Sequence, residues 1–210
     1  MRLSQPPTRP STQSGLTLLE VLLAVSLLGI LAYKGFAVLD SAADTTQAST
    51  SEVLVEERCQ IVLERIARAV MSSSRESLAP AAEAPLSTEE LTFQMHLGIE
   101  NGEVIWSDPE KIALEQLENE AYWTRTPEAG PEQRVVLTHL VRPYLEGELP
   151  NGMDDNGNGL IDEKGLSFVV DRNAVHIRIT LERVDGNGRL VTRTAQTTVT
   201  CRNPVPEVVP

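Results

Sequence analysis

Hydrophobic and polar residues divide the chain into an apolar segment, an amphipathic segment and a region of short alternating runs. The apolar segment covers residues 16–39, with Glu20 and Lys34 as its only charged residues. A membrane-spanning helix needs about 20 predominantly apolar residues, and a lysine near its end can extend its amine to the interface. Residues 16–39 are therefore predicted to form a transmembrane helix.

The amphipathic segment, residues 40–74, carries apolar residues in alternating steps of four and three. These positions are Val55, Cys59, Val62, Ile66 and Ala69. Such spacing places them on one face of a helix. We predict one helix from Leu16 to about Met71, roughly 80 Å long at 1.5 Å per residue. Its apolar first half should protrude, and its second half should pack on a sheet and end at the serines 72–74.

Short alternating runs in residues 75–210 predict one β-rich globular head after a loop at residues 78–87. Expected strands cover residues 91–97, 104–106, 134–141, 166–170, 175–181 and 190–201. The second run is expected to pair with the first across residues 98–102, and the last two should form a hairpin. Residues 111–123 have weak helical spacing. The predicted fold class is α+β, a long helix followed by a mostly antiparallel sheet.

Glu20 is the one acidic residue of the apolar segment, and its presence in a predicted membrane span has to be explained. A carboxylate within hydrocarbon is costly, so such a residue indicates a function and a cationic partner. No Lys or Arg lies between Leu16 and Tyr33. A cut after the small residue Gly15 would supply a free α-amino group at Leu16, and Glu20 would become the fifth residue of the mature chain.

Residues 1–15 differ from an ordinary secretory signal, because cleavage would precede the apolar segment instead of following it. They contain Arg2 and Arg9, no acid, and three prolines that oppose a helix. We interpret this segment as a cytoplasmic leader that is removed while the helix remains on the product.

The run Gly15-Leu16-Thr17, with Glu20 after it, resembles the class III signal of type IV pilins and type II secretion pseudopilins. Leu16 stands where these families more often have Phe. The resemblance implies cleavage after Gly15 by a prepilin peptidase and methylation of the Leu16 amine. It also implies that Glu20 meets the N-terminal amine of a neighbouring subunit during filament assembly.

Two further segments, residues 63–66 and 200–203, are similar to minor pseudopilins of the J type and to some minor type IV pilins. A J-type subunit would cross the bacterial inner membrane once, with its head in the periplasm. It would join minor and major pseudopilins at the tip of a periplasmic pseudopilus, above the inner-membrane assembly platform for protein secretion. A minor type IV pilin would instead prime a surface pilus for adhesion, motility or DNA uptake.

An acidic loop at residues 154–163 matches the opening of the EF-hand pattern, in which alternate oxygen-bearing residues precede a glycine. The expected Ca²⁺ ligands are the side chains of Asp154, Asn156 and Asn158, the Leu160 carbonyl, and a closing carboxylate from Asp162 or Glu163. Gly165 occupies the usual closing position, so the loop resembles the shortened calcium loops of extracellular proteins. A metal-free turn is the alternative. We interpret the similar turn at residues 185–188 as the tip of a hairpin.

Charge and chemistry disfavour two other classes of function, nucleic-acid binding and catalysis. The formal net charge is −12, and removal of Arg2 and Arg9 would leave −14, so nucleic acid is not an expected partner. We find no spacing typical of a nucleophile or of a catalytic metal motif among the three histidines and two cysteines. The chain is therefore not expected to be an enzyme; a membrane-anchored enzyme and a calcium-dependent adhesin on a pilin stem are the less favoured alternatives.

Cys59 and Cys201 are the only cysteines. One lies on the apolar stripe of the helix and the other at the end of the last strand. They could form a disulfide in the periplasm, or remain two buried thiols that act as small apolar residues. The sequence leaves both outcomes open.

Overall fold

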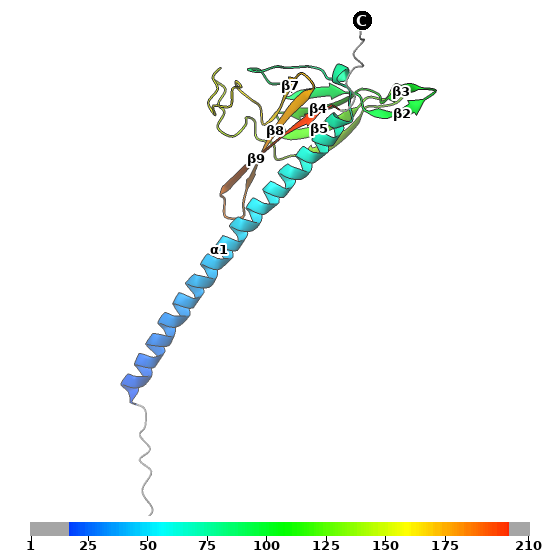
Figure 1. Cartoon of the computed structure of the whole chain (residues 1–210). Coiled ribbons are helices and arrows are strands. Elements are labelled where there is room, and N and C mark those ends of the chain that lie inside the picture. The colour runs from blue at the N-terminus through cyan, green and yellow to red at the C-terminus, as the bar shows by residue number, and fades with distance from the viewer. Residues whose placement is uncertain (1–16, 202–210) are drawn as a thin grey trace, which may run out of the picture. The chain divides into compact units, whose positions relative to one another are not determined.

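The computed structural model describes residues 17–201, which form one long helix followed by antiparallel strands (Figure 1). Helix α1 spans Leu18–Met71 and has 54 residues, and a short 3-10 helix, η1, spans Arg75–Ser77. The strands are β1 Glu90–Phe93, β2 His96–Glu100, β3 Glu103–Trp106, β4 Glu110–Glu115, β5 Glu120–Arg125, β6 Gln133–Thr138, β7 Leu166–Asp171, β8 Ala174–Val184 and β9 Leu190–Thr200. This arrangement confirms the predicted α+β class, with one long N-terminal helix and antiparallel sheets.

The chain forms two compact units, residues 1–46 and 47–210. In the first unit, every described residue from 17 to 46 is exposed. The hydroxyl of Ser26 donates to the carbonyl of Leu22, and that of Thr45 donates to the carbonyl of Ser41, both at 2.8 Å. Within the apolar segment, the bond to Leu22 satisfies the Ser26 hydroxyl without water.

In the second unit, the predicted apolar stripe of α1 is buried. Val55, Cys59, Val62, Ile66 and Ala69 are each at most 3% exposed. Leu63, Ala67 and Val70 widen the stripe, and all eight belong to the core that includes residues of the strands. The helix ends at the predicted serines, because the Ser73 hydroxyl donates to the Val70 carbonyl and competes with the helical pattern.

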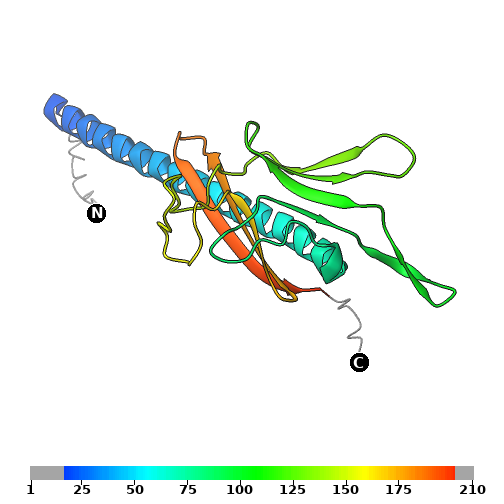
Figure 2. The same cartoon turned by 90° about the horizontal axis from the view of Figure 1, so that it is seen from above.

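The strands of the head form three antiparallel groups (Figure 2). One sheet has the order β1-β4-β5-β6, a second has the order β7-β8-β9, and β2 pairs only with β3. Residues Thr88 and Phe168 exchange backbone hydrogen bonds of 3.0 and 2.8 Å, which link the start of the first sheet to β7. The head therefore has one continuous core.

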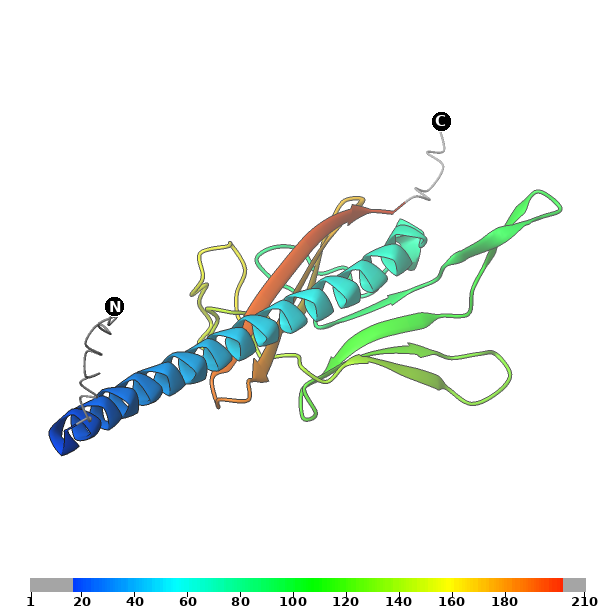
Figure 3. The same ribbon diagram turned by 90° about the horizontal axis from the view of Figure 1, so that it is seen from below.

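Strand β9 runs beside the second half of α1 (Figure 3). Arg193 on β9 forms an ion pair of 3.0 Å with Glu52 of the helix. The predicted β8–β9 hairpin is confirmed, with Val175, Ile177 and Ile179 fully buried on the core face. The turn at residues 185–188 is its tip, as expected.

The helical interpretation of residues 111–123 is wrong, because this region forms the antiparallel pair β4–β5. Ile112, Ala113 and Leu114 are all buried in β4, while Leu117 is 95% exposed in the connecting turn. Asn119 has φ +54, the left-handed conformation that closes such turns. The apparent helical spacing combined residues of two strands and their turn.

The single strand expected at residues 91–97 is divided between β1 and β2. Leu91 and Phe93 are fully buried in β1, whereas Leu97 in β2 is 59% exposed. Between them, the Met95 backbone N–H donates to the Ser107 hydroxyl at 2.9 Å, so the chain leaves the first sheet there. The expected pairing of β2 with residues 104–106 is confirmed.

Candidate assembly site and acidic loop

The predicted cleavage residues Gly15 and Leu16 lie outside the described residues. The described chain begins at Thr17, whose carbonyl and hydroxyl both accept the backbone N–H of Glu20, at 3.0 and 3.3 Å. Thr17 therefore caps the helix, and Glu20 stands at the third helical position, where a capping box places a Glu or Gln. The position of Glu20 therefore suits a capping box, apart from any role of its charge.

The start of α1 is long and apolar enough to cross a membrane. Its most hydrophobic window of 18 residues has a mean hydropathy of 2.1, and none of that window is buried in the structure. Leucine and valine side chains surround Glu20 on this exposed helix; Leu19 is 74% and Leu23 59% exposed. Lipid or neighbouring helices would have to cover such a surface.

The acidic loop is organised by Asp154. One of its carboxylate oxygens accepts the N–H groups of Gly157 and Asn158, at 2.7 and 3.2 Å, and the other accepts that of Gly159 at 2.7 Å. These backbone donors, Gly159 first, lower the pKa of Asp154. Gly157 and Gly159 have φ +76 and +88, so the loop needs glycine at both positions.

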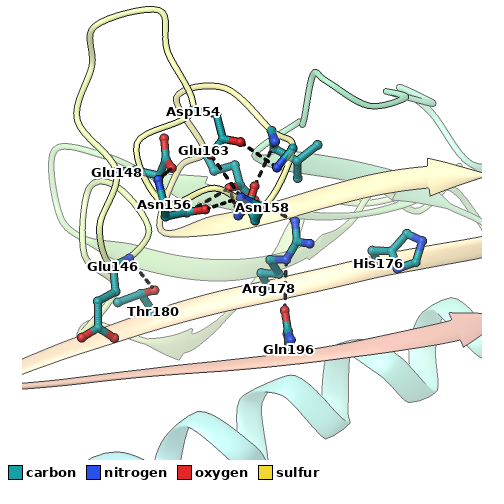
Figure 4. Close-up of polar contacts among 12 residues, drawn as sticks. Glu146, Glu148, Asp154, Asn156, Asn158, Glu163, His176, Arg178, Thr180 and Gln196 are labelled. Atoms are coloured by element: carbon teal, nitrogen blue, oxygen red, sulfur yellow. Dashed lines mark hydrogen bonds and ion pairs between the residues drawn. The ribbon is translucent and has the colours of Figure 1, made fainter.

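Glu163 is the buried centre of the same region (Figure 4). Its side chain is fully buried; one carboxylate oxygen accepts from the guanidinium of Arg178 at 2.8 Å. The other accepts from the side-chain amides of Asn158 and Asn156, at 2.5 and 3.5 Å. Three of the predicted ligand residues, Asn156, Asn158 and Glu163, are therefore in mutual contact.

Asp162 lies apart from this group. Its carboxylate accepts the backbone N–H groups of Asn151 and Gly152, each at 3.0 Å, and so fixes the turn at the start of the loop. Of the two closing carboxylates that the sequence allows, Glu163 is the one that contacts Asn156 and Asn158. The Leu160 side chain is buried, and its N–H donates to Asn158.

Gly165 replaces the closing glutamate of an EF-hand for a steric reason. A Cβ atom at this position would lie 1.7 Å from the backbone carbonyl oxygen of Arg142. The Gly165 N–H donates to the Pro143 carbonyl, and its carbonyl accepts from Thr180. No side chain fits between these strands, so a carboxylate can close the loop only earlier in the chain.

Glu148 is a residue of this region that sequence reasoning missed. It is 2% exposed, and one carboxylate oxygen accepts the Asn156 N–H at 3.1 Å. Burial raises the pKa of Glu148, and the negative charges of Glu163, Asp154 and Asp155 raise it further. Glu148 lies six residues before the motif, where no recognised spacing points to it.

Within residues 17–201, no three His, Cys, Asp or Glu side chains come together in an arrangement that could hold a metal ion. The acidic loop brings together carboxylates and amides instead. Calcium binding by the loop remains a prediction.

The two cysteines are free and buried, and no disulfide joins them in the structure. The Cys59 thiol lies 3.6 Å from the Ile179 carbonyl oxygen, whereas the Cys201 thiol lies 3.9 Å from the Ser73 hydroxyl. Cys59 and the end of α1 at Met71 are separated by about 18 Å at 1.5 Å per residue. A disulfide needs Cα atoms within about 7 Å, so contacts at opposite ends of this helical segment do not favour one.

Residues 10–32 match the family model described as the prokaryotic N-terminal methylation motif. No similar curated protein and no similar solved structure was found. The match includes the predicted cleavage site and Glu20, and it indicates a type IV pilin-like protein of the prepilin type. Such a motif implies processing by a prepilin peptidase and assembly with other pilin-like subunits. Together with the apolar start of α1, it fits a protein anchored in the membrane by a single pass.

Proposed function

We propose that this chain is a minor pseudopilin of a type II secretion system, a tip subunit that primes assembly of the pseudopilus. Prepilin peptidase would cut after Gly15, and the Leu16 amine would be methylated. The mature protein would then rest in the bacterial inner membrane, with its head in the periplasm, until the assembly platform adds it to the filament. Its role is to bind other subunits; it catalyses no reaction.

The position of Glu20 carries this proposal. The carboxylate lies on an exposed apolar helix, and the only basic residue of the described part of the first unit, Lys34, is 14 residues away. That separation is about 21 Å along a helix, too far for an ion pair. Because no lysine or arginine is near, the counter-charge is an α-amino group that cleavage creates, and in the filament the N-terminal amine of a neighbouring subunit supplies it. Pairing of the two charges in an apolar environment sets the axial position of each incoming subunit.

Variants of Glu20 separate this charge from the capping role. Glu20→Gln keeps a side chain that suits the capping box but removes the charge, and Glu20→Ala removes both. We expect cleavage and methylation of both variants, with incorporation into filaments reduced at least about tenfold in each, as one lost ion pair of 1.4 kcal/mol or more would give. Thr17→Ala is the matched control, because it removes the cap and leaves the charge. Normal incorporation of Glu20→Gln would refute the role of the charge.

Capture of the tagged full-length chain from its native membranes tests the choice of filament. Mass spectrometry should find a methylated N-terminus at Leu16, together with other minor and major pseudopilins and proteins of the secretion platform. Recovery of surface-pilus subunits instead would support a minor type IV pilin. An intact leader without pilin-like partners would overturn the proposal.

A further inference from the structure

Glu148 has a buried carboxylate oxygen that no group in the described residues satisfies. Its first oxygen accepts the Asn156 N–H, but the second has no hydrogen-bond partner and is inaccessible. A buried polar atom without a partner is costly, and a charged one more so. Nothing in the assembly role described above uses this residue.

The segment that carries this unpartnered Glu148 oxygen is bonded to the acidic loop. Two hydrogen bonds from a backbone N–H to a side-chain carboxylate join the segment of Glu148 to the loop: the Asn156 N–H donates to Glu148, and the Leu149 N–H donates to Asp155 at 3.2 Å. Gly147, with φ +89, allows close approach, since a Cβ there would lie 3.1 Å from the Asn156 Cβ. Glu148 is therefore held against the loop by both the backbone and its own side chain.

Asn156 joins the two buried glutamates. Its backbone N–H donates to Glu148, and its side-chain amide points to Glu163 at 3.5 Å. Figure 4 shows Glu148, Asn156, Asn158 and Glu163 as one group, whereas Glu146 lies apart, with its backbone N–H bonded to Thr180 and its carboxylate to Thr194 of β9. Arg178 neutralises Glu163. The charge on Glu148 has no such counter-ion, and Asp154 and Asp155 add two more negative charges around it.

We propose that Glu148 and Glu163 together hold one Ca²⁺ at the 154–163 loop, with Asn156 and Asn158 supplying amide oxygens. Every donor in this set is oxygen, the chemistry that hard cations prefer. The exposed side of the loop leaves room for water ligands, and Ca²⁺ accepts six to eight ligands in flexible geometry, whereas Mg²⁺ demands a regular octahedron. With only two carboxylates, the affinity falls in the range of extracellular modules, about 10⁻⁴ to 10⁻³ M.

Binding requires one local change. The amide nitrogens of Asn156 and Asn158 now donate to Glu163, and their amide oxygens accept the backbone N–H groups of Asn158 and Leu160. Each carboxamide must therefore leave both bonds and rotate to present its oxygen to the ion. The two amide nitrogens lie against the Glu163 carboxylate, which favours positive charge, so a cation can take their place. The site is independent of the proposed assembly role, because its residues lie in the head and Glu20 lies at the start of α1.

The test uses the full-length chain in detergent, with direct calcium binding by calorimetry and unfolding followed by the fluorescence of Trp106 and Trp123. Calcium should raise the unfolding midpoint in proportion to the logarithm of its concentration above Kd, and magnesium should raise it less. Glu148→Gln should weaken calcium binding at least about tenfold, the effect of losing one charged ligand worth 1.4 kcal/mol. The matched control Glu146→Gln, whose side chain bonds Thr194, should change Kd less than about twofold.

A second measurement shows whether Glu148 binds Ca²⁺ or has only a structural role. In chelator, Glu148→Gln should be at least as stable as the unmodified chain, because it removes a buried charge that has no counter-ion. Loss of stability in chelator with an unchanged calcium response would overturn the proposal. So would the absence of any calcium-dependent shift in the unmodified chain. Either result would leave the proposed assembly function untouched, since that rests on Glu20.

Discussion

The ion pair between Arg178 and Glu163 makes the sharpest prediction about the stability of the head. The guanidinium lies 2.8 Å from a carboxylate that is 0% exposed, and the Arg178 side chain itself is 20% exposed. Arg178 also donates to the Gln196 side chain at 3.2 Å. Arg178→Met would keep the length of the side chain but remove the charge, leaving Glu163 ionised in the interior or forcing it to take up a proton.

The loss in the free energy of unfolding depends on the groups that remain around Glu163. Removing one partner of a buried pair costs about 3–5 kcal/mol, because the other charge stays buried without compensation. The amides of Asn158 and Asn156 still donate to the second carboxylate oxygen, so we expect the lower end, about 3 kcal/mol. With a urea m-value of roughly 2 kcal/mol/M, the unfolding midpoint should fall by about 1.5 M.

The assay is urea unfolding of the full-length chain in detergent with chelator present, so that no cation can replace the guanidinium. Trp123 reports on the core, because its ring packs edge-on against Phe93 and its N–H donates to Glu110 at 2.7 Å. Adding Glu163→Gln to Arg178→Met should recover most of the loss, with a coupling energy of about 2 kcal/mol in a double-mutant cycle.

The matched control is Arg68→Met. Arg68 and Glu64 are 2.7 Å apart, but their side chains are 73% and 65% exposed on the surface of α1. Loss of such a pair should cost no more than about 0.5 kcal/mol. If Arg178→Met is no more destabilising than Arg68→Met, or if the two changes at 163 and 178 are additive, the buried ion pair does not support the head as argued.

Two further predictions concern buried positions of the head. Burial raises the pKa of the Cys59 thiol from 9.0 to about 11, so folding favours the neutral thiol; the resulting stability is complete below pH 9 and is lost as pH rises toward 11. The loss should be about 3 kcal/mol greater in the unmodified chain than in Cys59→Ala, measured by urea unfolding across this range; equal pH profiles would contradict it. Gly165→Ala should cost at least about 2 kcal/mol by the same assay, because its Cβ would meet the Arg142 carbonyl. Gly98→Ala, with no atom within 4 Å of the added Cβ, is the control and should cost less than about 1 kcal/mol.

Long, regular patterns could be read from the sequence with accuracy. The end of α1 at Met71 and the β8–β9 hairpin were predictable, because many residues in succession repeat a period of 3.6 or of two. The interpretation failed at residues 111–123, where each strand has only six residues and the turn contains an apolar residue, Leu117. Over so short a segment, side chains from two strands can match a helical period by chance.

The candidate sites show the same division between local and long-range information. The methylation motif lies in a short continuous segment, so the sequence alone indicates it. The acidic loop was recognised for the same reason, but its buried partners were not. Arg178 is 15 residues beyond Glu163, on strand β8, and Glu148 reaches the loop through a turn that only the folded chain defines. No spacing rule connects these residues.

Glu20 and Glu163 both need a counter-charge, and the source of that charge separates their roles. Glu163 has Arg178 within the same head, so folding compensates its charge, and removal of Arg178 should lower the stability of the head. Glu20 has no lysine or arginine within about 21 Å along α1, so in the proposed filament the N-terminal amine of a neighbouring subunit compensates its charge, and removal of that charge should reduce assembly. Glu20→Gln should therefore leave the unfolding midpoint of the head unchanged while filament incorporation falls, and Arg178→Met should lower that midpoint. A shift of the midpoint in Glu20→Gln would show that the two charges are not independent.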